Sequence, residues 1–511
     1  MAHDRTDPAR GTLLDLDLDL DLELDPDGEQ GGEPGGRSAG PLHLRLARAL
    51  RAAVTGGRIV AGSVLPPSRA LAADLGCSRW VVTEAYSQLI AEGYLEARSG
   101  SATRVCAGAV PVPGRGRAGR EAPWNPEYDM VPGMPDLRAF PRKRWADAVR
   151  EAAGSLPSAE LGYPDPAGHH RLRQRLAAHL VRGRGASLDA DRLMVCGGTL
   201  DGVLRLCRAL RADGHTHVAL EDPGWSRLSA AVAAAGLVPV AVPVDGDGLR
   251  VELLSRMPQV RAVIVAPAHQ FPTGVVLTPP RRAELIAWAR SVDGLVMEDD
   301  YDAEFRYDRH PVGSLQGMDP ERVALLGSIS KTLSPALRIG WVAAPPRWID
   351  GLRAANAAVA PPPVIDQEAF AGFLDAGAYD RHLRASRLRY RRRRDALLGE
   401  IASSLPGHQI SGAAAGFHLL LHLTDCAAAD VVREAARRDV RLADLDEYRM
   451  AAGPRGATLV LGYGNLADAA VPGAVRRLSE AVHVAEAVHE ARRRAGPPLR
   501  PAAGDASRAV V

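Results

Sequence analysis

The stretch that decides the fold of most of the chain is Ser328-Ile329-Ser330-Lys331-Thr332-Leu333-Ser334-Pro335, followed by Leu337-Arg338-Ile339-Gly340. It holds one of only two lysines, the other being Lys143, in a chain with 63 basic residues. Because arginine carries charge almost everywhere else, a remaining lysine can be needed for its amine. A primary amine can form a Schiff base, whereas an always-protonated guanidinium cannot. Codon bias with two chance survivors is the competing explanation, and only Lys331 has a context that argues against it.

A run of acidic residues precedes this stretch in the chain. Glu298-Asp299-Asp300-Tyr301-Asp302 follows the short apolar segment Leu295–Met297. Carboxylates at the end of a buried strand lie where α/β sheets bind ligands. An acidic surface loop is the alternative, and it fits poorly beside a buried strand.

Residues from about 125 to 490 alternate helical patterns with short apolar segments. Strands separated by helices are typical of an α/β fold with a parallel sheet. The predicted strands include residues 218–220, 238–242, 262–265, 295–297 and 323–326.

Residues 41–105 are predicted to form a small basic domain of three helices and a hairpin. Ser68 is a candidate N-cap of a second helix over residues 70–75, and Ser78 can cap a third helix that runs to about Glu92. This order of elements is typical of a winged helix-turn-helix. The two strands of the hairpin are expected at residues 94–98 and 103–105.

The remaining segments read as tails and a linker. Residues 1–40 are predicted to be a disordered acidic tail, because leucine alternates with dense like charge. Residues 106–123 are a linker rich in glycine, proline and arginine, and residues 492–511 form a flexible tail after a domain over residues 124–491.

The chain has no signal-peptide pattern, and no apolar run approaches the roughly 18–20 residues that a membrane helix needs. Its five cysteines form no CxxC pair, so neither a disulfide framework nor a metal site is predicted. We expect a cytoplasmic protein with no membrane partner.

The small domain closely resembles the GntR-type DNA-binding domain. The similar residues are Leu65-Pro66-Pro67-Ser68-Arg69-Ala70-Leu71-Ala72, Leu75-Gly76-Cys77-Ser78-Arg79, Ala85-Tyr86-Ser87-Gln88-Leu89 and Glu92-Gly93-Tyr94-Leu95. The resemblance implies a double-stranded DNA operator as partner, with Trp80 in place of a small polar residue. The expected DNA contacts are Arg69, Ser78, Arg79, Thr83 and Arg104.

The segment around Lys331 resembles the cofactor-lysine segment of fold-type I aminotransferases, which implies pyridoxal 5′-phosphate (PLP). By that resemblance, Lys331 forms the Schiff base, and Ser328 and Arg338 hold the phosphate. Asp299 pairs with the pyridine nitrogen, with Asp300 as the alternative. The ring hydroxyl is bound by the adjacent Tyr301.

Three further segments resemble parts of the same site. Glu221-Asp222-Pro223-Gly224-Trp225 resembles the loop whose aromatic residue stacks on the PLP ring, here Trp225. Gly197-Gly198-Thr199 is expected to offer backbone N–H groups to the phosphate at a helix N-terminus, chiefly from Gly198 and Thr199. Gly162-Tyr163-Pro164 resembles the segment whose tyrosine, Tyr163, reaches the phosphate of the partner subunit, which implies a homodimer.

Both modules in one chain, over residues 41–490, resemble the MocR/GabR subfamily of GntR-type regulators. The implied fold is a mostly α winged helix-turn-helix joined to an α/β aminotransferase domain of fold type I. The implied function is a DNA-binding regulator, with a degenerate aminotransferase domain, that binds PLP and senses PLP, an amine or an amino acid. An active aminotransferase is the main alternative, and a dimerising scaffold without cofactor is a third.

Two departures concern the end of the site that would hold an amino acid. Pro267-Ala268-His269-Gln270-Phe271-Pro272 has Phe271 where aminotransferases usually have asparagine, so a ring-hydroxyl donor is missing or comes from His269 or Gln270. Val460 stands where they carry the arginine that grips the substrate α-carboxylate, and Arg455 is near in sequence. Binding of an amino acid is therefore in doubt, and PLP itself becomes a candidate signal.

Overall fold

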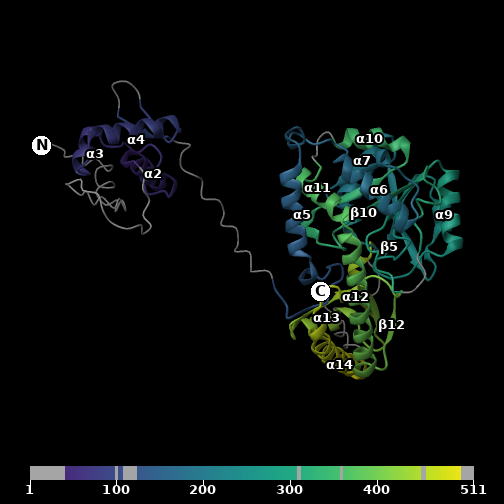
Figure 1. Cartoon of the computed structure of the whole chain (residues 1–511). Coiled ribbons are helices and arrows are strands. Elements are labelled where there is room, and N and C mark those ends of the chain that lie inside the picture. Colours follow the sequence, from purple (N-terminus) through teal and green to yellow (C-terminus); the bar gives the residue numbers. More distant parts are fainter. Residues whose placement is uncertain are drawn as a thin grey trace, which may run out of the picture. The chain divides into compact units, whose positions relative to one another are not determined.

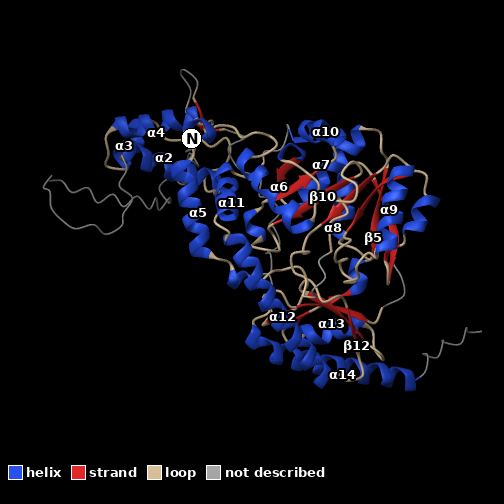
Figure 2. Ribbon diagram, turned by 45° about the vertical axis from the view of Figure 1, so that its right-hand side comes forward, coloured by secondary structure: helices blue, strands red, loops and turns tan. Residues whose placement is uncertain are grey.

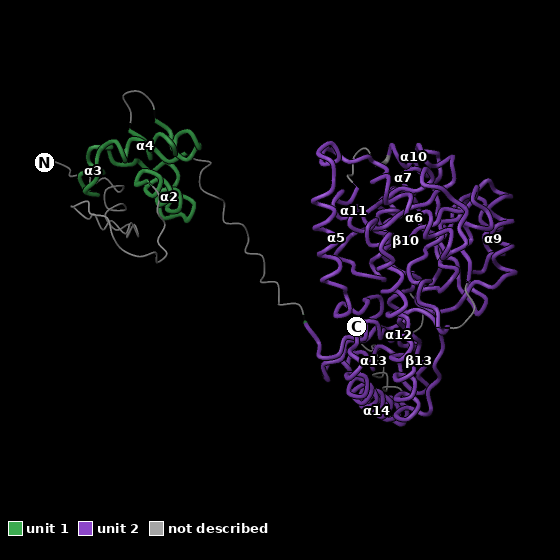
Figure 3. Tube along the Cα trace, viewed as in Figure 1, with its two compact units in different colours: residues 1–124 green, residues 125–511 purple. Residues whose placement is uncertain are grey.

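The computed structural model describes residues 41–97, 102–106, 124–307, 312–356, 361–450 and 456–495. The chain divides into two compact units, residues 1–124 and 125–511 (Figure 3). The predicted acidic tail, the linker from residue 107, Arg455 and the end of the C-terminal tail lie outside the described residues.

The small unit is a winged helix-turn-helix, as predicted. Its elements are α2 (Leu42–Thr55), α3 (Ser68–Asp74), α4 (Arg79–Ala91), β1 (Leu95–Glu96) and β2 (Arg104–Val105). β1 and β2 pair antiparallel. The helices share one apolar core, which includes Leu46, Leu50, Leu71, Val82 and Leu89.

The predicted helix caps are wrong in detail. α3 begins at Ser68 itself, with Pro67 at the N-cap position and no side-chain cap. Ser78 holds the N-cap position of α4, but its hydroxyl makes no capping hydrogen bond. The backbone of Pro67, at φ −54° and ψ 141°, already turns the chain into α3, because a proline ring fixes φ near the helical value. The hairpin strands are also shorter than expected.

The large unit is built on an eight-stranded sheet in the order β4-β11-β10-β9-β8-β5-β6-β7. The strands are β4 (Leu193–Cys196), β5 (His217–Asp222), β6 (Val238–Asp245), β7 (Gly248–Leu249), β8 (Val260–Val265), β9 (Leu295–Asp299), β10 (Val323–Ser328) and β11 (Gly340–Ala343). The five from β10 to β6 are parallel, as expected.

The prediction of a parallel sheet fails at β11, which runs antiparallel to both β10 and β4. A parallel return needs a crossover of a dozen or more residues, usually a helix. The connection from Ser328 to Gly340 is too short for one, so the chain reverses and β11 lies beside β10. Lys331 lies in this reversal.

Helices cover both faces of the sheet (Figures 1 and 2). α7 (Thr199–Ala212), α8 (Ser226–Ala234) and α10 (Pro346–Asn356) contribute to one core, and α9 (Pro279–Ser291) to another. Val218 and Leu220 of β5 pack with α7, whereas Ala219 packs on the α9 side. A third core includes buried residues of α5 (Arg142–Ser155), α6 (His170–Arg184) and α11 (Val364–Asp375). Burial on both faces explains the continuous apolar runs of these strands.

The long helix α12 (Ala378–Ser404) leads to a second, four-stranded sheet in the order β12-β13-β16-β15. Its strands are β12 (Gln409–Ser411), β13 (His418–His422), β15 (Ala443–Asp444) and β16 (Thr458–Gly462), and α13 (Ala428–Ala436) and α14 (Val471–Ala495) accompany them. Near it, β3 (Tyr128–Asp129) pairs with β14 (Val440–Arg441). Of the described helices, none is both long and apolar enough to cross a membrane.

Candidate cofactor pocket and DNA-binding surface

Lys331 and Asp299 meet at the carboxyl ends of neighbouring parallel strands. Asp299 is the last residue of β9, and Lys331 follows β10. The ammonium of Lys331 donates a hydrogen bond to the carbonyl oxygen of Gly133. Burial lowers the pKa of Lys331, and the charges of Asp299 and Asp302 oppose that shift. A lowered pKa increases the share of neutral amine, which is the nucleophilic form.

The two adjacent aspartates have different environments. Asp300 is held by Arg184 through two hydrogen bonds, Nε to Oδ2 at 2.7 Å and Nη2 to Oδ1 at 3.0 Å. Asp299 is also buried, but its Oδ1 has no hydrogen-bond partner among the described residues. Burial raises the pKa of Asp299 to about 7. A protonated pyridine nitrogen is the kind of partner that this orphaned oxygen lacks, so Asp299 suits the cofactor and Asp300 does not.

The other end of the pocket suits a phosphate. α7 begins at Thr199, and Gly198 before it has φ 111°, a conformation that favours glycine. A Cβ built on Gly198 would lie 3.7 Å from Nη1 of Arg338, so that guanidinium stands at the helix N-terminus. Ser328 is the last residue of β10 and its side chain is buried. It lies shortly before Lys331 in the sequence. Helix N–H groups, a hydroxyl and a cation together make an anion site.

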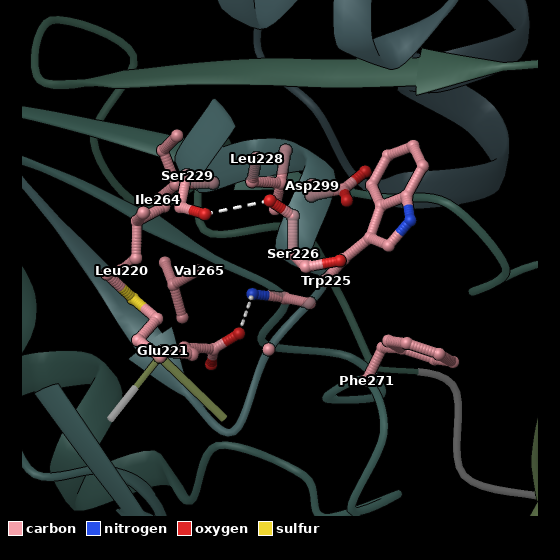
Figure 4. Close-up of a pocket in the computed structure, with 13 residues that line it drawn as sticks. Leu220, Glu221, Trp225, Ser226, Leu228, Ser229, Ile264, Val265, Phe271 and Asp299 are labelled. Carbon is pink, nitrogen blue, oxygen red and sulfur yellow. Dashed lines mark hydrogen bonds between the residues drawn. The ribbon is translucent and has the colours of Figure 1, made fainter. Parts of the chain in front are cut away.

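Between these ends lies the wall that would contact the ring (Figure 4). Trp225, at the N-cap position of α8, lies beside Asp299 in the lining of the pocket. The carboxylate of Glu221 accepts a hydrogen bond from the Ala266 amide at 3.1 Å, and burial raises the pKa of Glu221 to about 8. The other lining residues include Leu220, Ile264, Val265, Phe271 and Met450.

The structure adds a buried polar cluster next to Tyr301. The Tyr301 hydroxyl lies 3.1 Å from Nδ1 of His269, and the same nitrogen lies 2.7 Å from Oδ2 of Asp302. The ring of His418 packs against His269 at 4.9 Å between centroids. The amide of Gln270 is used locally, donating to Pro223 and Phe271 carbonyls. The sequence identifies His269 only as a candidate hydrogen-bond donor to the hydroxyl of the PLP ring. It gives no signal for His418, a single histidine at the start of β13.

Val460, at the position where the resemblance predicts the loss of the carboxylate-binding arginine, has apolar surroundings. Val460, in the middle of β16, is fully buried and forms a cluster with Leu420 and Ala443 of the adjacent strands. Tyr448 packs against this cluster and also contacts the ring of Phe271 at 5.0 Å.

Tyr163 does not join the pocket of its own chain. Its side chain is fully exposed, at 106% of the reference area, after a short turn of 3₁₀-helix over Ser158–Leu161. The resemblance gives Tyr163 a role in the site of a partner subunit, and its exposure in a single chain is compatible with that prediction.

The five residues predicted to contact DNA are all exposed. Arg69 lies on α3, and Arg79 and Thr83 lie on the first turns of α4, after Ser78. Nε of Arg79 donates to the Ser68 hydroxyl at 3.4 Å, which links the two helices. Arg104, on β2, donates to the Gly62 carbonyl oxygen at 3.2 Å.

Comparison with known proteins decides the family. Residues 42–105 match the model of bacterial regulatory proteins of the gntR family, and residues 134–445 match aminotransferase class I and II. The chain is 34% identical to the probable rhizopine catabolism regulatory protein MocR of Rhizobium meliloti over 69% of this chain and 76% of that one. The chain belongs to the MocR/GabR subfamily of GntR-type transcriptional regulators.

This regulator therefore binds DNA through its small unit, and the cofactor of its large domain is PLP. It is also 31% identical to the pyridoxine biosynthesis transcriptional regulator PdxR of Corynebacterium glutamicum, over 86% of this chain and 95% of that one. Solved aminotransferases share the fold. An archaeal alanine:glyoxylate aminotransferase matches with a TM-score of 0.65 at 23% identity, over 70% of this chain and 91% of that one. The predicted fold class is confirmed.

Proposed function

We propose that the large unit of this regulator holds PLP and changes DNA binding in response to PLP itself or to a small amine, without efficient transamination. One observation carries this proposal. Asp299 and Arg338 suit the ring nitrogen and the phosphate, whereas Val460, at the position that the resemblance gives to the carboxylate-binding arginine, lies among apolar side chains.

The residues that would hold PLP come from several elements. Lys331 would bind it covalently, Asp299 would pair with the ring nitrogen, and Tyr301 would bind the ring hydroxyl. Ser328, Arg338 and the N–H groups of Gly198 and Thr199 would hold the phosphate, and Trp225 would stack on the ring. Bound PLP supplies an electrophilic carbon that reacts with primary amines. The residues named above would orient that carbon.

We also propose that the regulator acts as a homodimer. The partner subunit's Tyr163 would complete the phosphate site, which explains why such a large side chain lies fully exposed in one chain. Because the target is DNA, the proposed location is the cytoplasm.

The signal is proposed to lack an α-carboxylate, or to be PLP. Amino acids would place a carboxylate against Leu420, Ala443 and Val460, and a buried carboxylate without a cation is unfavourable. The name of the relative PdxR, a pyridoxine biosynthesis regulator, supports PLP as the signal and vitamin B6 synthesis as the regulated process. Contacts to DNA are proposed for Arg69, Ser78, Arg79, Thr83 and Arg104.

The test is DNA binding by the full chain to fragments upstream of its own and neighbouring genes. We expect PLP to change the affinity of the wild-type protein for one such fragment. The Lys331→Ala variant should still bind the DNA, but PLP should no longer change its affinity. An amine should shift the affinity further only if it is the signal, and adding an α-carboxylate to that amine should not improve its effect. Binding that is identical with and without PLP and amines would contradict the proposal.

An active aminotransferase is the second candidate, because Lys331, Asp299 and Arg338 are all in place. It predicts steady turnover of an amino donor with a keto acid over many cycles. Turnover limited to a single cycle would favour the sensor.

A further inference from the structure

Trp80 exposes 62% of its surface on the first turn of α4, the helix that enters DNA in this class of domain. Within residues 42–105, which form the winged helix-turn-helix, the other described aromatic residues, Tyr86 and Tyr94, are buried or half-buried. The apolar side of α4, with Val82 and Ala85, packs into the core of the unit. Trp80 therefore lies on the side of the helix that faces away from this core.

The indole is held in place before any DNA arrives. Its ring meets the ring of His43, on the first turn of α2, edge to face at 5.3 Å and 70°. An aromatic pair of this geometry stabilises the observed side-chain orientation. A side chain that is already ordered loses little entropy when it makes a contact.

The neighbours of Trp80 include two residues that the sequence predicts to contact DNA. Arg79 directly before it and Thr83 one turn later are both exposed, and the Thr83 hydroxyl is tied to the Arg79 carbonyl oxygen at 2.9 Å. Side chains at the start of a recognition helix lie against base edges in the major groove.

We propose that Trp80 selects thymine in the operator by contact with its C5-methyl group. An indole has a single N–H donor and no acceptor, so it cannot make the paired hydrogen bonds that identify adenine or guanine. It does offer a flat apolar surface, and the thymine methyl is the apolar group that the major groove displays. This inference rests on DNA binding by the small unit and is independent of the cofactor.

The test uses an operator selected from random duplexes by the full-length regulator. Each thymine is then replaced singly by deoxyuridine, which removes only the methyl group. For wild type we expect one position in each half-site to weaken binding about four-fold, the equivalent of exposing one buried methyl group. Fluorescence anisotropy of labelled duplexes measures the affinities.

The decisive comparison is with Trp80→Asn and Trp80→Ala. Both variants should bind the operator but be indifferent to deoxyuridine at that position. Ile90→Ala is the matched control, because Ile90 is a partly exposed apolar residue at the far end of α4, and it should keep the four-fold effect. Circular dichroism melting would establish that all variants are folded.

Wild-type binding that is unaffected by deoxyuridine at every position would overturn the proposal. So would Trp80→Asn with undiminished sensitivity to the methyl group. If the regulator selects no duplex at all, the DNA-binding function itself fails, which is a separate and recognisable result.

Discussion

The two ends of one pocket differ in what they offer a ligand. At the phosphate end, Arg338 stands at the N-terminus of α7, with Gly198 shaped to admit an anion. Val460 and its apolar neighbours occupy the position that the resemblance gives to the carboxylate-binding arginine of aminotransferases, and Phe271 occupies that of their asparagine. Under the proposal made above, the fold keeps the groups that bind a cofactor and lacks the arginine that grips an amino acid.

Such a division fits a sensor better than a catalyst. Interactions with the phosphate and ring nitrogen serve binding, whereas a bidentate grip on the substrate serves orientation for reaction. A regulator needs the interactions that bind the cofactor and can dispense with the grip on a substrate. Four predictions test the residues at the cofactor end of the pocket, in order of decreasing effect.

The largest effect is expected at Lys331. The Lys331→Ala variant should lose completely the absorbance band that a lysine-bound cofactor produces, because no arginine can replace the amine. Lys143→Ala is the matched control, since Lys143 is exposed and pairs only with Asp147 on the surface. A band that survives in Lys331→Ala, or disappears in Lys143→Ala, would contradict the assignment.

Substitutions of the two adjacent aspartates should have different effects. The change at Asp300 should lower protein stability, and the change at Asp299 should lower the affinity for PLP. Asp300→Asn leaves the buried Arg184 without its counter-charge, so we expect the free energy of unfolding to fall by about 3 kcal/mol. Asp299→Asn removes a carboxylate with an orphaned oxygen, so the stability of the cofactor-free protein should hardly change while PLP affinity falls. Denaturant unfolding and spectroscopic PLP titration measure the two effects. The reverse pattern would assign Asp300 to the cofactor.

The phosphate end can be tested through Arg338. Arg338→Ala should weaken PLP binding by about 2 kcal/mol, or roughly 30-fold, which is typical of a charged hydrogen-bonded contact. Binding of pyridoxal, which has no phosphate, should be unaffected. Arg150→Ala, an exposed arginine paired with Asp147, provides the control. Equal losses for PLP and pyridoxal would show that Arg338 acts elsewhere.

The smallest effect concerns pH and Glu221. Burial raises the pKa of its carboxyl group from 4.5 to about 8, so the folded state binds more protons than the unfolded state between these values. Stability should therefore fall as pH rises through this window, by about 1.4 kcal/mol per pH unit from this group. Glu221→Gln should reduce the slope of unfolding free energy between pH 5 and 7 by that amount. An unchanged slope would refute the assignment.

The sequence by itself determined both modules and predicted the candidate cofactor residues. The apolar runs that form β9 and β10 end directly at Asp299 and Ser328, and the carboxyl ends of parallel strands meet at one edge. Residue types and spacing near Lys331 were therefore sufficient to predict a cofactor pocket. The small unit was equally predictable, because its helices are separated by clear turn residues such as Gly76 and Gly93.

Only the tertiary structure decided which of the two adjacent aspartates suits the cofactor. Asp299 and Asp300 are adjacent and chemically identical, but of the two only Asp300 accepts hydrogen bonds from Arg184, 116 residues earlier, among the described residues. The apolar surroundings of Val460 likewise depend on Leu420 and Ala443, which meet it through strand pairing across the small sheet. Contacts between residues far apart in the chain leave no local pattern, so the sequence predicted the pocket and packing decided what it can hold.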